Sequence, residues 1–247
     1  MVAATFRFYA GLNDFLARGR RGHDFGASCA ENATTKHMIE ALGVPHTEVA
    51  LVLVNGASAG LDQLIEEGDR VAVYPRFLRL DVADLARTAR APPGRLRFVA
   101  DAHLGGLARL LRMAGFDTIY RNTLDDGEIE ALALEADRIV LTRDRELLKR
   151  RGIAYGAYVR ALKAQEQLGE VFERFGLAER ARPFTLCLHC NAALRPVAKE
   201  AVLERLPPQV RASQDAFQTC DACGRVYWKG SHWQRMRAML DAAAARD

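Results

Sequence analysis

Four acidic side chains in the middle of the chain are the residues best suited to chemistry. Asp101 and Asp144 each follow a short apolar run. Asp126 and Glu128 stand where a helical pattern begins. Carboxylates about 4 Å apart repel one another by roughly 4 kcal/mol per pair, at an effective dielectric of about 20, unless a cation lies among them. Such oxygen ligands suit Mg²⁺ or Mn²⁺, which also bind phosphate. The pattern therefore predicts a divalent-metal site that acts on phosphate, with Asp101, Asp126 and Asp144 as ligands.

Each of these acids also has a purely structural interpretation. Asp is common at helix N-termini and in turns, because its short side chain accepts hydrogen bonds from the nearby backbone. Three acids at successive strand–helix junctions favour a metal site over three unrelated caps. For any one residue alone, the capping interpretation stays open.

Two CxxC pairs near the C-terminus form a second group. Cys187 and Cys190 make the first pair and Cys220 and Cys223 the second, with 29 residues between them. Four thiolates satisfy tetrahedral Zn²⁺ and leave no open position for catalysis, so the pairs predict a structural zinc. The flanking residues have the pattern of paired strands in a zinc ribbon. A redox-active CxxC is the alternative, and it would not need the second pair.

Basic residues near both groups predict contacts with phosphate. Guanidinium groups bind phosphate in bidentate fashion, and affinity for nucleic acid is largely electrostatic. Residues 179–247 hold 11 Lys and Arg against 7 Asp and Glu, so the excess positive charge lies there. Ion pairs with neighbouring acids are the alternative for each residue. The candidates are Arg109, Arg112, Arg143, Lys149, Lys229 and His232.

The elements that must position the acids have the pattern of an α/β fold. Apolar runs at 96–100, 118–120 and 138–142 have the composition of buried strands, with helical periodicity between them. Strands that alternate with helices favour a parallel sheet, whose strand carboxyl ends share one edge. Asp101 and Asp144 are expected at that edge.

These segments resemble a known family. The chain looks like the PIN-like nuclease domain of the Mut-seven C-terminal RNase family in FVADAHLGGLARLLRMAGFDT, DDGEIEALA and IVLTRDRELLKR. The resemblance implies RNA cleavage at a Mg²⁺ or Mn²⁺ site held by Asp101, Asp126 and Asp144. PIN domains carry a further acid on an additional helix, for which this chain leaves no obvious place. Either Asp125 or Glu128 stands in, or the site works with fewer acids, so the number of metal ions stays open.

The resemblance continues into the zinc ribbon, in LRPVAKEAVLERLPPQV and FQTCDACGRVYWKGSHWQRM. It implies RNA as the partner, including structured RNA such as tRNA, and makes the basic candidates RNA contacts. The segment Val226–Trp233 mixes aromatic and cationic side chains, as surfaces that bind unpaired bases do. Packing of Trp228 and Trp233 onto the nuclease domain is an equally favoured alternative.

The first 80 residues form a separate segment. Strands are expected at Thr5–Tyr9, Ala50–Asn55 and Arg70–Pro75, with a helix at Ala33–Leu42. This order resembles the ubiquitin-like β-grasp fold, and GDRVAVYP is similar to the sulfur-carrier branch. The exposed Gly-Gly end of sulfur carriers is absent, because the strand continues into Pro75 and beyond. A docking role with a protein partner is therefore expected.

Composition and length set the remaining bounds. No apolar run approaches the roughly 18 residues of a membrane helix, so no membrane partner is expected, and cytoplasmic location is predicted. Five cysteines, four of them in CxxC pairs, indicate metal ligands in a reducing compartment.

We expect an α/β PIN-like domain preceded by an α+β β-grasp domain and followed by a Cys₄ zinc ribbon. The expected bounds are 1–80 for the β-grasp domain, 81–95 for a linker, 96–178 for the RNase domain and 179–247 for the ribbon extension.

The expected function is metal-dependent hydrolysis of RNA, with Asp101, Asp126, Glu128 and Asp144 as catalytic residues and the ribbon helping to grip the strand. The alternative is a non-catalytic RNA- or protein-binding adaptor in which the acids only cap helices.

Overall fold

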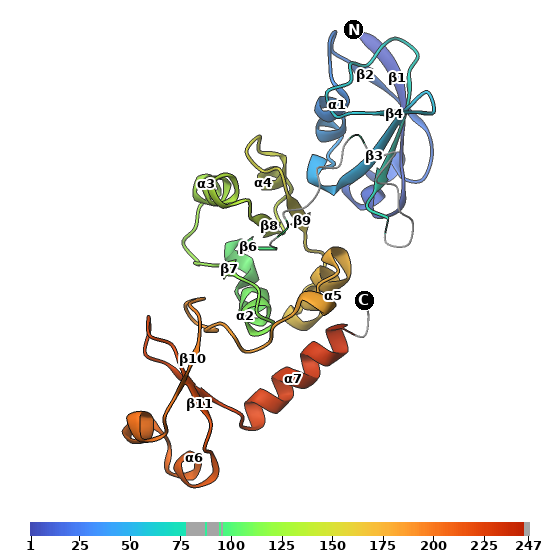
Figure 1. Ribbon diagram of the computed structural model, residues 1–247. Helices are drawn as coiled ribbons and strands as arrows, with labels where there is room; N and C mark the ends of the chain where they lie inside the picture. The colour runs from blue at the N-terminus through green and yellow to red at the C-terminus, as the bar shows by residue number, and fades with distance from the viewer. Residues whose placement is uncertain (78–86, 88–93, 95, 245–247) are drawn as a thin grey trace. The chain divides into compact units, whose positions relative to one another are not determined.

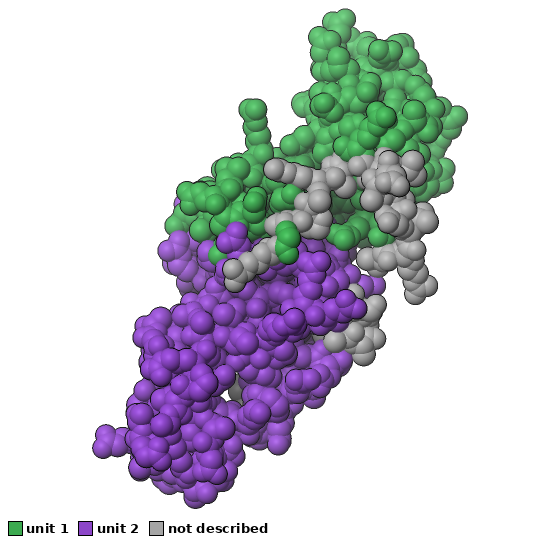
Figure 2. Space-filling view, viewed as in Figure 1, with its two compact units in different colours: residues 1–94, 126–158 green, residues 95–125, 159–247 purple. Residues whose placement is uncertain are grey.

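The computed structural model describes residues 1–77, 87, 94 and 96–244, without the side chains of residues 232, 243 and 244. Two compact units divide the chain, coloured green and purple in Figure 2. The first contains Met1–Gly94 and Asp126–Tyr158, and the second Arg95–Asp125 and Val159–Asp247. The predicted linker, residues 81–95, lies almost wholly outside the described residues. Residues 126–158 thus group with the N-terminal segment, a division that the sequence did not predict.

A five-stranded sheet forms most of the N-terminal segment. β1 pairs antiparallel with its hairpin partner and parallel with the last strand, as in β-grasp folds, so the predicted fold is confirmed. Short 3-10 turns join the elements, namely η1 (Ala10–Phe15), η2 (Arg18–Arg20) and η3 (His46–Glu48). The sheet order is β2 (Phe25–Cys29), β1 (Val2–Phe8), β5 (Arg70–Pro75), β3 (Val49–Val54) and β4 (Ala57–Ala59).

Helix α1 (Thr35–Ala41) packs on this sheet and closes the core. Alternation along β1 places Phe6 and Phe8 in the same buried cluster as Ile39 of the helix. The Thr34 side chain caps the first turn, and Gly43 follows the helix at φ 105°, which side chains disfavour. Cys29 also belongs to this core.

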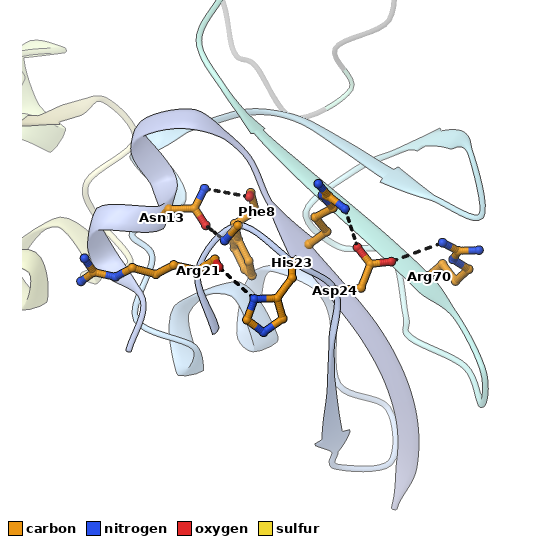
Figure 3. A network of polar contacts seen from close by, with 8 residues as sticks. Phe8, Asn13, Arg21, His23, Asp24 and Arg70 are labelled. Atoms are coloured by element: carbon orange, nitrogen blue, oxygen red, sulfur yellow. Dashed lines mark hydrogen bonds and ion pairs between the residues drawn. The ribbon is translucent and has the colours of Figure 1, made fainter. Parts of the chain in front are cut away.

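A polar network ties the connection between β1 and β2 to the sheet, as Figure 3 shows. Asp24 accepts a hydrogen bond from Arg7 of β1 at 3.1 Å and pairs with Arg70 of β5 at 3.4 Å. Asn13 donates to the Phe8 carbonyl at 2.9 Å. These ion pairs are exposed, so each stabilises the fold by at most about 1 kcal/mol. Their effect is to fix the path of the connection.

The first unit also holds part of the predicted nuclease domain. β8 and β9 are parallel, with Val140 opposite Gly156, and β8 is buried along its whole length. The strand predicted at 138–142 and the helix before it are therefore confirmed. The elements run in the order α3 (Asp126–Ala136), β8 (Ile139–Thr142), α4 (Arg145–Lys149) and β9 (Gly156–Tyr158).

The second unit holds the other part of that domain. β6 pairs parallel with β7, which confirms parallel strands at both predicted runs. Leu107 and Leu111 bury one face of α2, which packs against α5. Edge-on contacts of Phe116 with Phe98 and Phe172 fill the core beside them. The elements are β6 (Phe98–Ala100), η4 (Ala102–Leu104), α2 (Gly105–Met113), β7 (Thr118–Ile119), α5 (Ala164–Phe175) and η5 (Ala178–Arg180).

A three-stranded antiparallel sheet follows, in the order β10 (Arg195–Val197), β11 (Phe217–Thr219) and β12 (Val226–Trp228). Between its first two strands, η6 (Glu200–Arg205) and α6 (Pro208–Ser213) enclose a small core around Val202, Leu206 and Phe217. Helix α7 (Ser231–Ala244) then lies along α5, as Figure 1 shows. This sheet, with its cysteine cluster, has the predicted zinc-ribbon arrangement.

Within the described part of the chain, no helix has both the length and the apolar character that crossing a bilayer requires.

Candidate functional sites

The four cysteines of the CxxC pairs lie together beside the ribbon sheet. Their Sγ atoms are all within 4.8 Å of one another. The Cys187–Cys223 and Cys190–Cys220 sulfur distances are 3.6 Å and 3.4 Å. A tetrahedral Zn²⁺ with bonds of about 2.3 Å separates its sulfur ligands by about 3.8 Å. Both the donor chemistry and the spacing therefore fit Zn²⁺.

Tyr227 of β12 supports this cluster from outside. Its hydroxyl lies 3.1 Å from Sγ of Cys187. Burial raises the pKa of the Cys187 thiol, but hydrogen bonds from Tyr227 and from backbone N–H groups of the first knuckle outweigh it and lower the pKa to about 6. The thiolate is the form that binds metal, so these bonds prepare Cys187 as a ligand.

Arg112 holds the first knuckle in place. Its Nε donates to the Thr118 carbonyl at 2.9 Å, and its Nη1 donates to the carbonyls of Leu188 and His189 at 3.2 Å and 2.7 Å. The residue is only 5% exposed, and burial lowers the pKa of its guanidinium. A buried guanidinium that donates to backbone carbonyls is a poor phosphate ligand. Arg112 thus has a structural role at the first knuckle, and the RNA contact predicted for it stays a prediction.

Asn191, directly after Cys190, is a second link that the sequence did not reveal. Its backbone has a φ of 70°, a conformation that Asn adopts more readily than most residues. Its side chain donates to Oδ1 of Asp117 at 2.6 Å and accepts the N–H of Thr118 at 3.0 Å. The first knuckle is therefore fixed to the start of β7 from two sides.

Asp101 follows β6 directly, in the second unit, and is half-buried. Its Oδ1 accepts the backbone N–H of Ala102 at 2.5 Å, which caps the 3-10 turn η4. The predicted capping role is therefore real. A carboxylate offers about four lone-pair positions, so one cap bond is compatible with ligation of a metal.

The other three predicted catalytic acids lie in the first unit and are exposed. Asp126 and Glu128 occupy the first turn of α3. Asp144 caps α4 through the N–H of Glu146 at 2.8 Å. Its own N–H donates to Oγ1 of Thr142 at 2.9 Å, so the turn after β8 is fixed locally.

Arg150, directly after α4, pairs with acidic residues of α3. Its Nε donates to Oε2 of Glu130 at 2.6 Å, and its Nη1 lies 3.9 Å from Oδ2 of Asp126. The bond from Arg150, together with one from the Gly152 N–H, lowers the pKa of the Glu130 carboxyl. The guanidinium also places positive charge beside Asp126, which offsets repulsion among the acids.

The basic residues near Asp144 differ in their surroundings. Lys149 donates to Oε1 of Glu146 at 2.7 Å, so the ion-pair alternative applies to it in this structure. Arg143, between Thr142 and Asp144, is half-buried. The phosphate contact predicted for Arg143 stays a prediction.

Of the basic candidates in the second unit, Lys229 stands near an aromatic ring. Arg109 of α2 and Lys229 after β12 are both exposed. The Nζ of Lys229 lies 5.5 Å from the ring centroid of Trp233, and that ring packs against Phe184 at 4.9 Å. This contact lies within residues 179–247, the predicted ribbon extension, so packing of Trp233 onto the nuclease domain stays an alternative, and Trp233 is partly exposed. The side chain of His232 lies outside the described residues.

Residues 126–158 contact the β-grasp domain through side chains that no sequence pattern singles out. Glu48 is 5% exposed, and its Oε1 accepts the N–H of Tyr158 at 2.7 Å. His46 uses both ring nitrogens, since Nδ1 lies 2.7 Å from Oε1 of Glu40 and Nε2 lies 3.0 Å from the Ile153 carbonyl. Buried polar contacts of this kind fix one arrangement of the two segments.

Arg145, next to Asp144, belongs to the same contact. Its Nη1 donates to the Phe15 carbonyl at 3.2 Å. The guanidinium carbon lies 5.2 Å from the Phe15 ring centroid and 5.9 Å from that of Tyr158. These two rings meet edge-on at 5.3 Å. Arg145 thus faces the β-grasp domain.

Comparison with known proteins supports the architecture. A family model described as Mut7-C ubiquitin matches residues 1–81, and one described as Mut7-C RNAse domain matches residues 96–240. No curated protein matches the chain. The crystal structure of SAMP1 from Haloferax volcanii is similar at 22% identity and a TM-score of 0.25, covering 30% of this chain and 96% of that one. Because the RNase-domain model spans more than half of the sequence, the chain belongs to the Mut7-C RNase domain family.

Proposed function

We propose that this protein hydrolyses phosphodiester bonds in RNA at a Mg²⁺ or Mn²⁺ site held by Asp101, Asp126 and Asp144. Membership of an RNase domain family supports a nuclease. The main support for this site is that acidic residues stand at chain positions where parallel strands end. Asp101 comes directly after β6, and Asp144 comes two residues after β8.

Carboxylate oxygens are the donors that hard divalent cations prefer, so the residues fit the metal. When bound, such an ion stabilises developing charge on the phosphate and makes a water more acidic. Glu128, exposed in the first turn of α3, would either add a ligand or accept a hydrogen bond from the attacking water. Arg143 would donate to a phosphate oxygen beside Asp144.

The zinc ribbon would help to bind the RNA but would contribute no catalytic residue. Zn²⁺ on Cys187, Cys190, Cys220 and Cys223 would be structural, because four thiolates close the coordination sphere. The exposed cations Arg109 and Lys229 would grip the RNA, and His232 stays a proposed contact. The β-grasp domain would offer a surface to a protein partner, while its buried contacts hold residues 126–158.

The test is cleavage of end-labelled RNAs by the zinc-loaded protein, with added Mn²⁺, with added Mg²⁺ and with neither. We expect metal-dependent cutting that falls at least about 100-fold in Asp101→Asn and in Asp144→Asn. Glu135→Gln, which changes an exposed acid elsewhere on α3, is the matched control and should cut normally. The pattern of labelled products distinguishes endonucleolytic from exonucleolytic cleavage.

Full cutting by Asp144→Asn would rule out the proposed site. Tight RNA binding without cleavage of any substrate, indifferent to Mn²⁺, would instead support the non-catalytic adaptor. In that case Asp101 and Asp144 would serve only as helix caps.

A further inference from the structure

One groove in the second unit stands out by its size and by its lining. Its volume is about 1000 Å³, at the upper end of the range for small-ligand pockets. It opens between the ribbon strand β12, the start of α7 and the exposed side of α2. Its lining includes Arg109, Phe184, Tyr227, Trp228, Lys229 and Trp233. We call this feature the ribbon groove.

Aromatic rings form much of its surface. Phe184, Tyr227, Trp228 and Trp233 all line it, and all four are partly exposed. Phe184 is held at a φ of 62°, a conformation that bulky residues rarely adopt, and its ring packs on Trp233. Strained residues persist where surrounding contacts demand them, often at binding sites. Phe184 combines this conformation with a place in the lining of the groove.

The charge of the groove is positive. Four cations line it, and none of the described residues that line it is acidic. Arg237 is partly neutralised, because its Nε pairs with Asp241 at 3.0 Å. Arg109, Arg225 and Lys229 are all exposed and supply the remaining charge. A polyanion is therefore the complementary occupant.

Aromatic rings beside cations distinguish between polyanions. Bases in a duplex are stacked on one another, so a duplex offers mainly phosphates to a protein, whereas an unpaired strand offers base faces as well. An acidic peptide would match the charge but would leave the aromatic surface without planar partners. The lining favours an unpaired strand.

One lining residue, Arg109, lies on the helix that follows a proposed catalytic residue. Arg109 lies on α2, and Asp101 caps the turn that precedes this helix. Eight residues of helix and 3-10 turn span on the order of 12 Å along the axis. A strand that contacts Arg109 would therefore lie within a few nucleotides of Asp101.

We propose that the ribbon groove binds an unpaired RNA segment, with bases on its aromatic surface and phosphates on Arg109, Arg225 and Lys229. The inference rests on the proposed function and specifies its substrate as RNA with a single-stranded region beside the bond that is cut.

Binding can be measured in the full-length, zinc-loaded Asp144→Asn variant without Mg²⁺ or Mn²⁺. Both tryptophans of the chain line the groove, so intrinsic fluorescence reports its occupancy. The probes are an unstructured 12-nucleotide RNA, a blunt RNA hairpin and a Glu-rich peptide of similar charge. We expect saturable quenching by the unstructured RNA, at least about tenfold weaker binding of the hairpin, and no response to the peptide.

Variants then assign the site, with binding followed by anisotropy of end-labelled RNA. Lys229→Ala with Arg225→Ala should weaken binding about tenfold or more and reduce its salt dependence. Trp233→Leu keeps an apolar side chain but removes a stacking surface, and should weaken binding about tenfold. Arg235→Ala removes an exposed cation on α7 that does not line the groove, and should bind within about twofold of the parent. Unchanged zinc content establishes that each variant is folded.

Equal binding of hairpin and unpaired RNA, or unchanged binding by the Lys229/Arg225 variant, would overturn the proposal. Preferential binding of the peptide would identify the groove as a site for acidic protein segments. The two proposals fail separately. Binding of unpaired RNA without any cleavage would support the groove proposal and rule out the nuclease proposal. RNA cleavage with an unchanged KM in the Lys229/Arg225 variant would support the nuclease proposal and rule out the groove proposal.

Discussion

The guanidinium of Arg145 donates a hydrogen bond to the backbone carbonyl of Phe15, 130 residues earlier in the chain. The same group stacks near the rings of Phe15 and Tyr158. Arg145 directly follows Asp144, the proposed metal ligand that caps α4. The β-grasp domain therefore contacts the residue next to the proposed catalytic turn, and the two parts of the first unit are joined at that point.

Removal of this side chain should weaken the joint. We expect Arg145→Ala to lower the free energy of unfolding of the first unit by about 1–2 kcal/mol, because a charged hydrogen bond and cation–π contacts are lost. Thermal unfolding and limited proteolysis of the full-length protein would measure it. Arg151→Ala, at an exposed position nearby, is the control and should change stability by less than about 0.5 kcal/mol. Equal stability of the two variants would contradict a role for the Arg145 contact.

A second prediction compares two arginines on one helix. Arg112→Ala should destabilise the protein by about 2–4 kcal/mol, because it leaves buried carbonyls of Thr118 and the first knuckle without a donor. Arg109→Ala should leave stability within about 0.5 kcal/mol, since Arg109 is exposed, but should weaken RNA binding. Thermal unfolding and RNA anisotropy on both variants separate the effects. A stable Arg112→Ala protein with weakened RNA binding would support the RNA contact predicted for that residue.

Arg112 also shows where sequence reasoning reaches its limit. Helical spacing from Leu107 and Leu111 places residue 112 near the edge of the apolar face of α2, where a phosphate contact is reasonable. Periodicity gives the direction of a side chain but not what packs there. In the structure the ribbon packs there, and its Leu188 and His189 carbonyls come from 76 and 77 residues away.

The helices and strands could be predicted from the sequence, because the patterns that indicate them are local. The strand predicted at Arg70–Pro75 has those bounds in the structure, and the helix expected at Ala33–Leu42 is α1, Thr35–Ala41. The grouping of residues 126–158 with the β-grasp domain could not be predicted from the sequence. It depends on side chains such as His46 and Glu48, which have no distinctive pattern in sequence and gain their partners only through the fold.

A third prediction concerns the zinc cluster. Tyr227→Phe removes the hydroxyl that lies 3.1 Å from Sγ of Cys187, so zinc affinity should fall about tenfold while the ribbon still folds at saturating zinc. Competition with a chromophoric chelator would measure the affinity. Tyr120→Phe is the control, because its hydroxyl donates to the Ala102 carbonyl away from the cysteines. Equal zinc affinity in both variants would exclude a role for the Tyr227 hydroxyl.

The last prediction is a pH dependence that arises from Glu130. The bonds from Arg150 and the Gly152 N–H lower the pKa of this carboxyl in the folded protein from its ordinary value of 4.5. A carboxyl with a lower pKa in the folded state adds stability above the unfolded pKa, and that stability is lost as pH falls through the folded value. Wild type should therefore be more stable than Glu130→Gln at pH 7, and the difference should shrink as pH falls below about 4.5. Urea unfolding of both proteins between pH 4 and pH 7 would measure the difference in their free energies of unfolding. The other carboxyls titrate in both proteins, so their contribution cancels in this difference. Glu135→Gln, an exposed acid on the same helix, should show no such trend. A Glu130→Gln difference that is the same at pH 4 and pH 7 would mean that the ion pair with Arg150 does not stabilise the fold.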